Sequence, residues 1–316
     1  MDSEILQKCI KAGKIAAQVR RETAARLEKP GASFLESLDF AEGRILKLGG
    51  QIAWAQMALN DVAAHFCPEE DDTQVSQEGD LIKVDIGVHI DGYIADNAMA
   101  VEVATKEYTD LIKAAQNALK SAIKLVRPGC QLWELGEAQY SEAEALGFTT
   151  VKNLSGHTIT PYTVHGGVSI PAFNNKDKTE LQEGWQVAIE PFVTNGQGMI
   201  REKGKATVFM VEAEKGVRSL YAKKILEQVK PQQGLPFTTR WLTRKLGKGS
   251  AVLGLRELQQ SGIIHAYPPL SIYTLHQPNT YIYYIFRLLH EYPFGGICCF
   301  AQGAFFFCLC FSCLCP

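Results

Sequence analysis

The chain has 316 residues, a net charge of −2 and 46% hydrophobic residues, a composition typical of a globular protein with one or two domains. There is no overall excess of basic residues, so nucleic acid is not expected as a partner. The first residues, MDSEILQKCIKAGK, are charged and amphipathic and do not form a secretory signal peptide, which predicts a cytoplasmic protein. Three of the cysteines are scattered along the chain, as in a reducing compartment, and the other six crowd between positions 298 and 315.

Helical periodicity predicts helices over residues 3–28 and 33–48, the second with a capping box formed by Ser33 and Glu36. The mostly apolar stretch 51–68 follows and contains His65. A single histidine in such a stretch is more often a hydrogen-bonded core residue than a functional one. The next segment, EEDDTQVSQ, is acidic and polar, and we expect it to be a solvated turn.

Residues 81–101 alternate apolar with small or polar side chains around a single turn signal, Asp91-Gly92, which predicts a β-hairpin. In that register Asp85 and Asp96 lie on the same face of the hairpin, one diagonal step apart. Diagonal neighbours are roughly 7–8 Å apart at Cα. Two buried carboxylates at that spacing need something between them, and one or two cations would fit.

Two more amphipathic helices are predicted, over 107–126 and 131–146, with further strands after them. This order indicates an α+β fold with helices on one side of an antiparallel sheet. His157 and His165 follow in a loop-like stretch rich in glycine and threonine, where binding residues often occur, although either alone is explained as a structural residue. Glu190 closes the apolar run WQVAI, where a carboxylate is costly unless it is paired or bound to metal.

The character of the chain changes after residue 204. Helices are predicted over 219–229, 237–246 and 250–260, the last capped by Ser250, and the strand-like GIIHAYP follows. This is a winged-helix pattern, which often binds DNA. Here the basic residues are interleaved with apolar ones and form no compact stripe, so DNA binding is the less favoured interpretation.

Five motifs occur in order: AAHF, KVDIGVHIDGYIADNA, NLSGHTI, VHGG and AIEPF. Together they resemble the methionine aminopeptidases of the pita-bread fold, in particular the short archaeal type II form, which carries an insert where type I has none. The resemblance covers residues 1 to about 268. It implies a pita-bread catalytic domain over 1–204, a helical winged-helix-like insert over 205–267, and a divergent, hydrophobic, cysteine-rich tail over 268–316 in place of the final catalytic strands.

The resemblance also implies a set of metal ligands: Asp85, Asp96, His157 and Glu190. Asp96 would bridge two ions, and Glu190 would also act as the catalytic proton shuttle. His65 and His165 would be catalytic, substrate-binding histidines that bind no metal. His165 would steady the developing oxyanion, and His65 would contact the incoming peptide.

The family removes the initiator methionine from new proteins when the second residue is small. Two cations about 3.5–4 Å apart would lower the pKa of a bridging water towards ~7 and polarise the substrate carbonyl. Oxygen ligands with a single imidazole suit Co, Mn, Fe or Zn. We therefore expect two divalent ions, N-terminal methionyl peptides as substrates, and a monomer.

The chain departs from the family pattern near its end. The family has a fifth, bridging glutamate ligand, and its position here is Ile282. From Ser271 onward the only formally charged residues are Arg287 and Glu291. The favoured interpretation is a frame-shifted or wrongly joined end, in which case the last strand of the sheet would be lost and an edge exposed.

Three other interpretations of this end remain open. The uncharged stretch 297–315 is close to the minimum length for a membrane anchor, although no basic residues flank it. The run CLCFSCLC could be a metal-binding tract, and Glu291 could replace the missing ligand. A second departure is Ala53-Trp54-Ala55-Gln56, where the family usually has a Phe-Pro segment lining the methionine pocket. Trp54 would either refill that pocket or block it.

Two alternative functions follow from these features. One is a catalytically crippled pita-bread protein that binds a peptide or a protein partner. The other is a different pita-bread hydrolase such as a proline dipeptidase, against which the insert and NLSGHTI argue.

Overall fold

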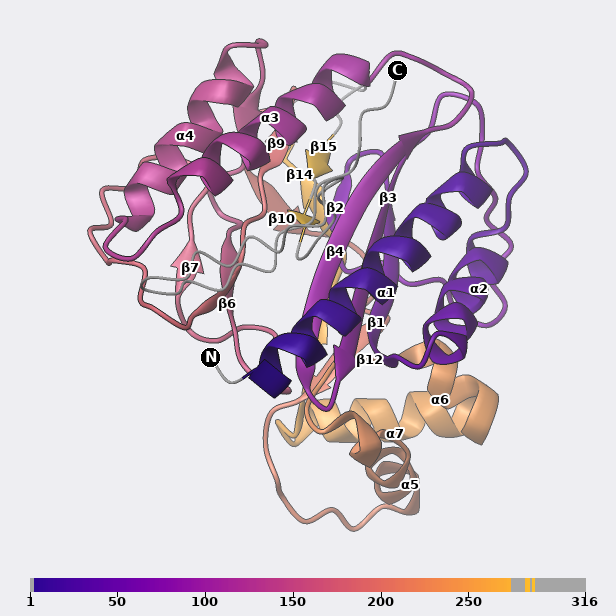
Figure 1. Ribbon diagram of the computed structural model, residues 1–316. Coiled ribbons are helices and arrows are strands. Elements are labelled where there is room, and N and C mark those ends of the chain that lie inside the picture. Colours follow the sequence, from indigo (N-terminus) through magenta and orange to yellow (C-terminus); the bar gives the residue numbers. More distant parts are fainter. Residues whose placement is uncertain (1–2, 274–281, 285, 288–316) are drawn as a thin grey trace.

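The computed structural model describes residues 3–273, 282–284 and 286–287 (Figure 1). Its central feature is an antiparallel sheet with the strand order β1-β3-β4-β16. The strands are β1 (Gln51–Leu59), β3 (Leu81–Ile90), β4 (Tyr93–Glu102) and β16 (Phe286–Arg287). Strands β3 and β4 form the predicted hairpin, and the register places Asp96 opposite Gly87 as expected. Asp91 and Gly92 both have positive φ, 50° and 86°, as a two-residue type I′ turn requires.

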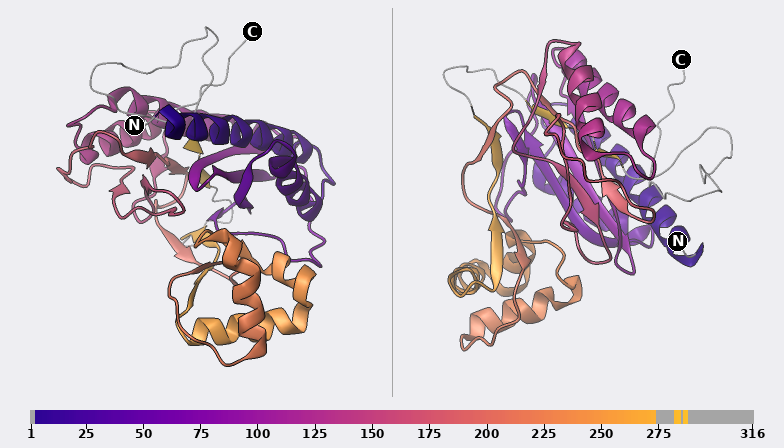
Figure 2. Two further views of the ribbon diagram at one scale, coloured as in Figure 1. Left: turned by 60° about the horizontal axis from the view of Figure 1, so that its bottom comes forward. Right: turned by 90° about the vertical axis from the view of Figure 1, so that its left-hand side faces the viewer.

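Helices α1 (Ser3–Leu27) and α2 (Phe34–Lys47) cover one face of this sheet, where Val84, Ile86 and Val88 pack against them. Side chains alternate along a strand, so Asp85 faces away from these helices. Helices α3 (Thr109–Leu125) and α4 (Leu132–Glu144) pack beside the remaining strands. Figure 2 shows these helices along one side of the strands, which confirms the predicted α+β arrangement.

Short antiparallel strands complete this part of the molecule in three further sheets. They are β5 (Thr149–Thr150), β9 (Phe192–Thr194) and β15 (Ile282–Tyr284); β6 (Gly156–Ile159), β7 (Ser169–Ile170) and β8 (Gln186–Ala188); and β2 (Val62–Ala64), β10 (Ile200–Glu202) and β14 (Leu270–Ile272). Within the part of the chain that the structure describes, no helix is both long and apolar enough to cross a membrane. The candidate anchor 297–315, Glu291 and the CLCFSCLC run lie outside the described residues.

The expected loss of the last strand was wrong. Strand β15 pairs with β9, placing Ile282 opposite Thr194, and β16 pairs with β4, placing Phe286 opposite Ala98. The stretch YIYYIF is rich in aromatic and β-branched residues, which favour strands even where the family's metal-binding carboxylate is absent.

Residues 205–267 form a unit of three helices and a three-stranded sheet with the order β12-β11-β13. Its elements are β11 (Val208–Val211), α5 (Leu220–Val229), the 3-10 turn η1 (Lys230–Gln232), β12 (Phe237–Thr238), α6 (Thr239–Leu246), α7 (Lys248–Gln260) and β13 (Ile264–Tyr267). Two predicted boundaries were wrong. Phe237 belongs to a strand and stacks on Phe209 at 5.9 Å, and α7 begins at Lys248 after Gly247, whose φ of 79° separates it from α6. The domain boundaries at 204 and 267 remain predictions.

The acidic turn after residue 68 does not simply face solvent as expected. Glu69 accepts from Lys205 at 2.8 Å, Glu70 pairs with Arg244, and Asp71 pairs with Lys248 at 2.6 Å. The sequence prediction failed because these cations come from the 205–267 unit, far along the chain. The turn is therefore part of the contact that holds this unit against the central sheet.

The tip of the hairpin is held by His89. Its Nδ1 accepts from the Gly92 backbone N–H at 3.1 Å, and its ring meets that of Tyr162 edge-on at 5.5 Å. The Tyr162 N–H donates to the Gly92 carbonyl at 2.9 Å. A side chain at Gly92 would overlap the Tyr162 ring, so glycine is needed here for space as well as for its φ. These contacts fix the loop between His157 and His165 on the hairpin.

Acidification should destabilise the protein through His89, because burial lowers the pKa of its imidazole from 6.5 to about 4. The unfolded chain binds this proton more readily, so stability from a neutral His89 is complete above about pH 6.5 and is lost as the pH falls to about 4. After allowance for solvent screening near the tip, we expect a loss of about 2 kcal/mol. Urea unfolding of the wild type and of His89→Asn between pH 7 and 4 measures this loss. If the free energy of unfolding fell equally with pH in both proteins, His89 would not be its source.

Candidate metal centre

The hairpin supplies two of the predicted ligands from adjacent strands. Asp85 on β3 and Asp96 on β4 are 7% and 6% exposed, so both carboxylates are almost fully buried. They reach the same face because Gly87, not Asp85, is directly opposite Asp96. The prediction that Asp85 and Asp96 lie on the same face of the hairpin is therefore confirmed.

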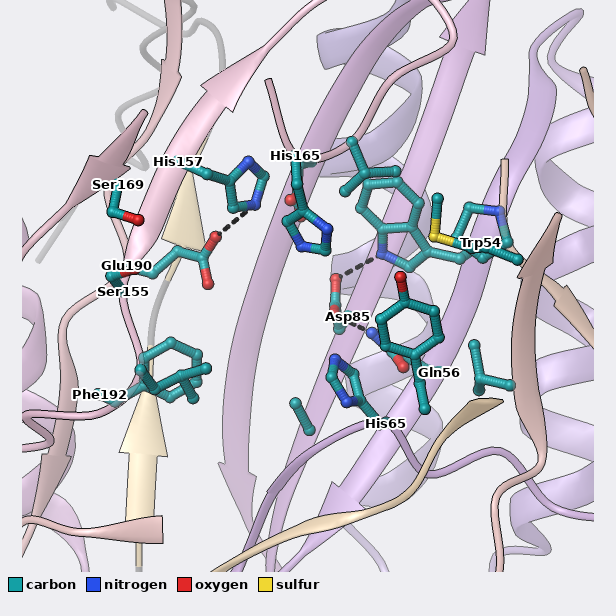
Figure 3. Close-up of a pocket in the computed structure, with 18 of the residues that line it drawn as sticks. Trp54, Gln56, His65, Asp85, Ser155, His157, His165, Ser169, Glu190 and Phe192 are labelled. Carbon is teal, nitrogen blue, oxygen red and sulfur yellow. Dashed lines mark hydrogen bonds and ion pairs between the residues drawn. The ribbon is translucent and has the colours of Figure 1, made fainter. Parts of the chain in front are cut away.

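His157 comes from the neighbouring β6, and Glu190 lies two residues after the end of β8. The two strands pair with His157 opposite Ala188, and a Cβ on Gly156 would overlap the Ala188 carbonyl oxygen. This close approach brings His157 Nε2 to 3.0 Å from Glu190 Oε1 (Figure 3). Glu190 and Pro191 lie between β8, which ends at Ala188, and β9, which begins at Phe192.

Asp96, His157 and Glu190 form a cluster in which one ligand atom from each lies within 4.8 Å of the others. Asp85 is not part of that cluster but lines the same cavity, which has a volume of about 450 Å³. The structure brings all the predicted site residues to this cavity: His65, Asp85, Asp96, His157, His165 and Glu190. Their individual roles stay predictions.

The charges of the cluster favour a cation. Burial, followed by the negative charges of Asp85 and Glu190, raises the pKa of Asp96 well above its usual range. Burial lowers the pKa of His157, but the hydrogen bond and charge of Glu190 outweigh it, so the net shift is upward. Three carboxylates with so little solvent are poorly compensated by one imidazole, whereas a divalent ion would neutralise them. The donor set therefore fits a divalent metal with oxygen and imidazole ligands.

The two remaining histidines frame the cavity without joining the cluster. The His165 ring meets that of His157 edge-on at 4.6 Å, and His65 meets Tyr267 at 5.3 Å. Burial lowers the pKa of each to about 4, so both are neutral at pH 7. Among the described residues, His65 Nδ1 has no hydrogen-bond partner, and its backbone φ of 64° is unusual for a non-glycine residue. An uncharged imidazole has one N–H that donates and one ring nitrogen that accepts.

Sequence reasoning missed two donors on β1. Trp54 Nε1 donates to Asp85 Oδ1 at 2.9 Å, and Gln56 Nε2 donates to Asp85 Oδ2 at 2.6 Å (Figure 3). Only the register of β1 against β3, which places Gln56 opposite Asp85, could have revealed these contacts. The 205–267 unit also contributes wall residues that the motifs do not include: Val208, Met210, Pro236 and Tyr267.

A family model described as metallopeptidase family M24 matches residues 7–218. A methionine aminopeptidase of Pyrococcus horikoshii is 44% identical over 268 residues, covering 84% of this chain and 90% of that protein. The chain belongs to metallopeptidase family M24. Within the family it groups with the methionine aminopeptidases, since the one from Archaeoglobus fulgidus is 40% identical over 86% of this chain and 91% of its own length. Methionine aminopeptidase 2 of Komagataella phaffii is 32% identical over 77% of this chain and 59% of its own length, in line with the predicted type II form.

Solved structures agree on the fold. A thermophilic Arx1 superposes with a TM-score of 0.78 at 15% identity, covering 90% of this chain and 88% of that one. The methionine aminopeptidase of Thermotoga maritima gives 0.59 at 24% identity, covering 64% and 85%. At these identities the likeness concerns the fold alone, and it confirms the predicted pita-bread architecture. Membership of an M24 metallopeptidase family, together with the cluster of Asp96, His157 and Glu190, makes a divalent metal the cofactor of this protein.

Proposed function

We propose that this protein is a metal-dependent aminopeptidase that removes the N-terminal methionine of proteins whose second residue is small. The observation that carries the proposal is the buried cluster of Asp96, His157 and Glu190, open to a cavity, in a chain 44% identical to a methionine aminopeptidase. Its substrates would be methionyl peptides and new proteins, in the cytoplasm, and the enzyme would be a monomer. A binder without catalysis is not favoured, because the similarity to methionine aminopeptidases extends over 84% of this chain.

Asp96, His157 and Glu190 would hold one divalent ion, and Asp85 with Asp96 would hold a second. When bound, such ions supply an activated water and a Lewis acid for the substrate carbonyl. Isoleucine at 282 offers no ligand atom, so the second ion would depend on Asp85 and Asp96 and would bind more weakly than the first. Activity should then increase with added metal over a wide concentration range.

The proton and charge movements would fall to this chain's own side chains. Glu190 would accept the proton of the attacking water and pass it to the leaving amine, because its carboxylate is at the cavity wall. His165, as a neutral imidazole, would donate a hydrogen bond to the oxygen on which negative charge develops. His65, next to Tyr267, would contact the peptide that enters.

The test is to incubate the full-length protein, with Mn²⁺ or Co²⁺, with the peptides Met-Gly-Met-Met and Met-Lys-Met-Met. We expect release of methionine from the first and none from the second, measured by chromatography of the free amino acid. Absence of release from either peptide, in a protein that binds Mn²⁺, would instead support the non-catalytic binder. Release from both would refute the requirement for a small second residue.

A further inference from the structure

The indole of Trp54 is held in one place by its surroundings. Its ring packs over Gly87 on the neighbouring strand, where a Cβ would overlap the ring. Trp54 is only 6% exposed and lines the metal cavity. The pairing of β1 with β3 shifts by one residue between Ile52 and Trp54, a bulge that re-aims the strand next to the site. The indole N–H therefore has a fixed direction, and it points at Asp85.

Trp54 and Gln56 together hold both oxygens of Asp85, one donor on each. A carboxylate oxygen has two lone-pair directions, so an oxygen that accepts a hydrogen bond can also bind a cation. Among the described residues, Gln56 Oε1 is buried without a hydrogen-bond partner. The side-chain amide of Gln56 therefore leaves its oxygen unpaired while its nitrogen donates to Asp85. Leaving a buried acceptor unpaired costs free energy. An arrangement that served packing alone would have no reason to bear this cost.

We propose that Trp54 and Gln56 are positioning residues that hold Asp85 in the orientation required to bind a divalent ion. This inference rests on the proposed metallo-aminopeptidase function and deepens it. It is specific to this chain, because Trp54 occupies a position in the segment where the sequence departs from the family pattern. A ligand held in its binding orientation loses little freedom when the metal arrives. Loss of such an outer contact typically weakens metal binding about 10- to 100-fold.

The variants that test it are Trp54→Phe and Gln56→Met, each of which removes one donor while keeping a side chain of similar size. The matched control is Trp241→Phe: the Trp241 indole also donates to a carboxylate, Glu42, at 2.8 Å, but away from the metal cavity. Mn²⁺ is titrated into the metal-free proteins by calorimetry, and the visible spectrum of the Co²⁺-loaded proteins is recorded. Thermal unfolding of the metal-free forms checks that each variant folds.

We expect the Mn²⁺ affinity of the second ion, which Asp85 and Asp96 would hold, to fall about 10- to 100-fold in Trp54→Phe and in Gln56→Met, with a changed Co²⁺ spectrum, while Trp241→Phe binds as the wild type does. An affinity for the second ion within twofold of wild type and an unchanged spectrum would overturn the inference, as would tighter binding. If Trp54→Phe does not fold, Gln56→Met decides. A wild type that binds Mn²⁺ but releases no methionine would overturn the proposed function and leave this inference standing, and one that binds no Mn²⁺ would overturn both.

Discussion

Replacing Asp96 with asparagine is expected to lower kcat/KM for Met-Gly-Met-Met by about 1000-fold or more. Asp96 belongs to the compact cluster and also neighbours Asp85, so both proposed ions depend on it. Losing several kcal/mol of metal-derived stabilisation corresponds to about three powers of ten in rate. Steady-state kinetics with saturating Mn²⁺ measures the change.

Although Asp96→Asn should lower activity, it should not lower the stability of the metal-free protein. Burial and the charges of Asp85 and Glu190 raise the pKa of Asp96, so the ionised carboxylate costs stability at neutral pH. Removing that charge relieves the repulsion, and metal-free Asp96→Asn should melt at a temperature equal to or above that of the metal-free wild type. Addition of Mn²⁺ should then stabilise the wild type and leave the variant almost unchanged.

These two measurements together distinguish a ligand from a structural residue. A structural role for Asp96 predicts a variant that is less stable with and without metal. Normal Mn²⁺ stabilisation together with near-normal activity in Asp96→Asn would refute the proposed centre. The matched control is Asp110→Asn. Asp110 is an exposed carboxylate in the first turn of α3 and outside the cavity, so its replacement should change neither activity nor stabilisation by Mn²⁺.

Local sequence signals predicted the half of the site that a single hairpin builds. The Asp91-Gly92 turn sets the register, and the register sets which carboxylates share a face, so Asp85 and Asp96 followed from a few adjacent residues. His157 and Glu190 needed the resemblance, because they meet through pairing of β6 with β8, and no local signal states which short strands pair.

The parts that escaped prediction depend on contacts between distant segments. Gln56 reaches Asp85 only through the β1–β3 register, which includes a bulge that composition does not reveal. Phe237 looked helical because its neighbours are, but a tertiary contact with Phe209 draws it into a strand. The acidic turn looked solvated because its cationic partners lie more than 130 residues away in the sequence.

Arg240 is expected to be the residue whose loss most destabilises the contact between the 205–267 unit and the central sheet. Its side chain has no exposed surface, yet it pairs with Asp39 and Glu42 on α2. Burial raises the pKa of Glu42, and the charge of Arg240 opposes that shift. Arg240→Met would leave Glu42 buried without its ion-pair partner, at a cost of about 3–5 kcal/mol in the free energy of unfolding.

Urea unfolding at pH 7 tests this, with Lys248→Met as the control. Lys248 belongs to the same contact through its ion pair with Asp71 in the acidic turn. Its side chain is 60% exposed, so its loss should leave stability almost unchanged. The double variant Arg240→Met/Glu42→Gln should recover most of the loss, because it removes the stranded charge as well. A double variant no more stable than Arg240→Met would mean that packing around Arg240, not its pairing with Glu42, holds the unit in place.

The same substitution should also change peptide binding, because the 205–267 unit lines the metal cavity through Met210, Pro236 and Tyr267. The proposed ligands themselves lie on the hairpin, on β6 and just after β8, away from the ion pairs of Arg240. A unit that is held less firmly should therefore bind peptide more weakly while the metal centre keeps its chemistry. We expect KM for Met-Gly-Met-Met to rise in Arg240→Met with kcat changed little, and a fall in kcat at constant KM would show that the unit acts on the metal centre instead.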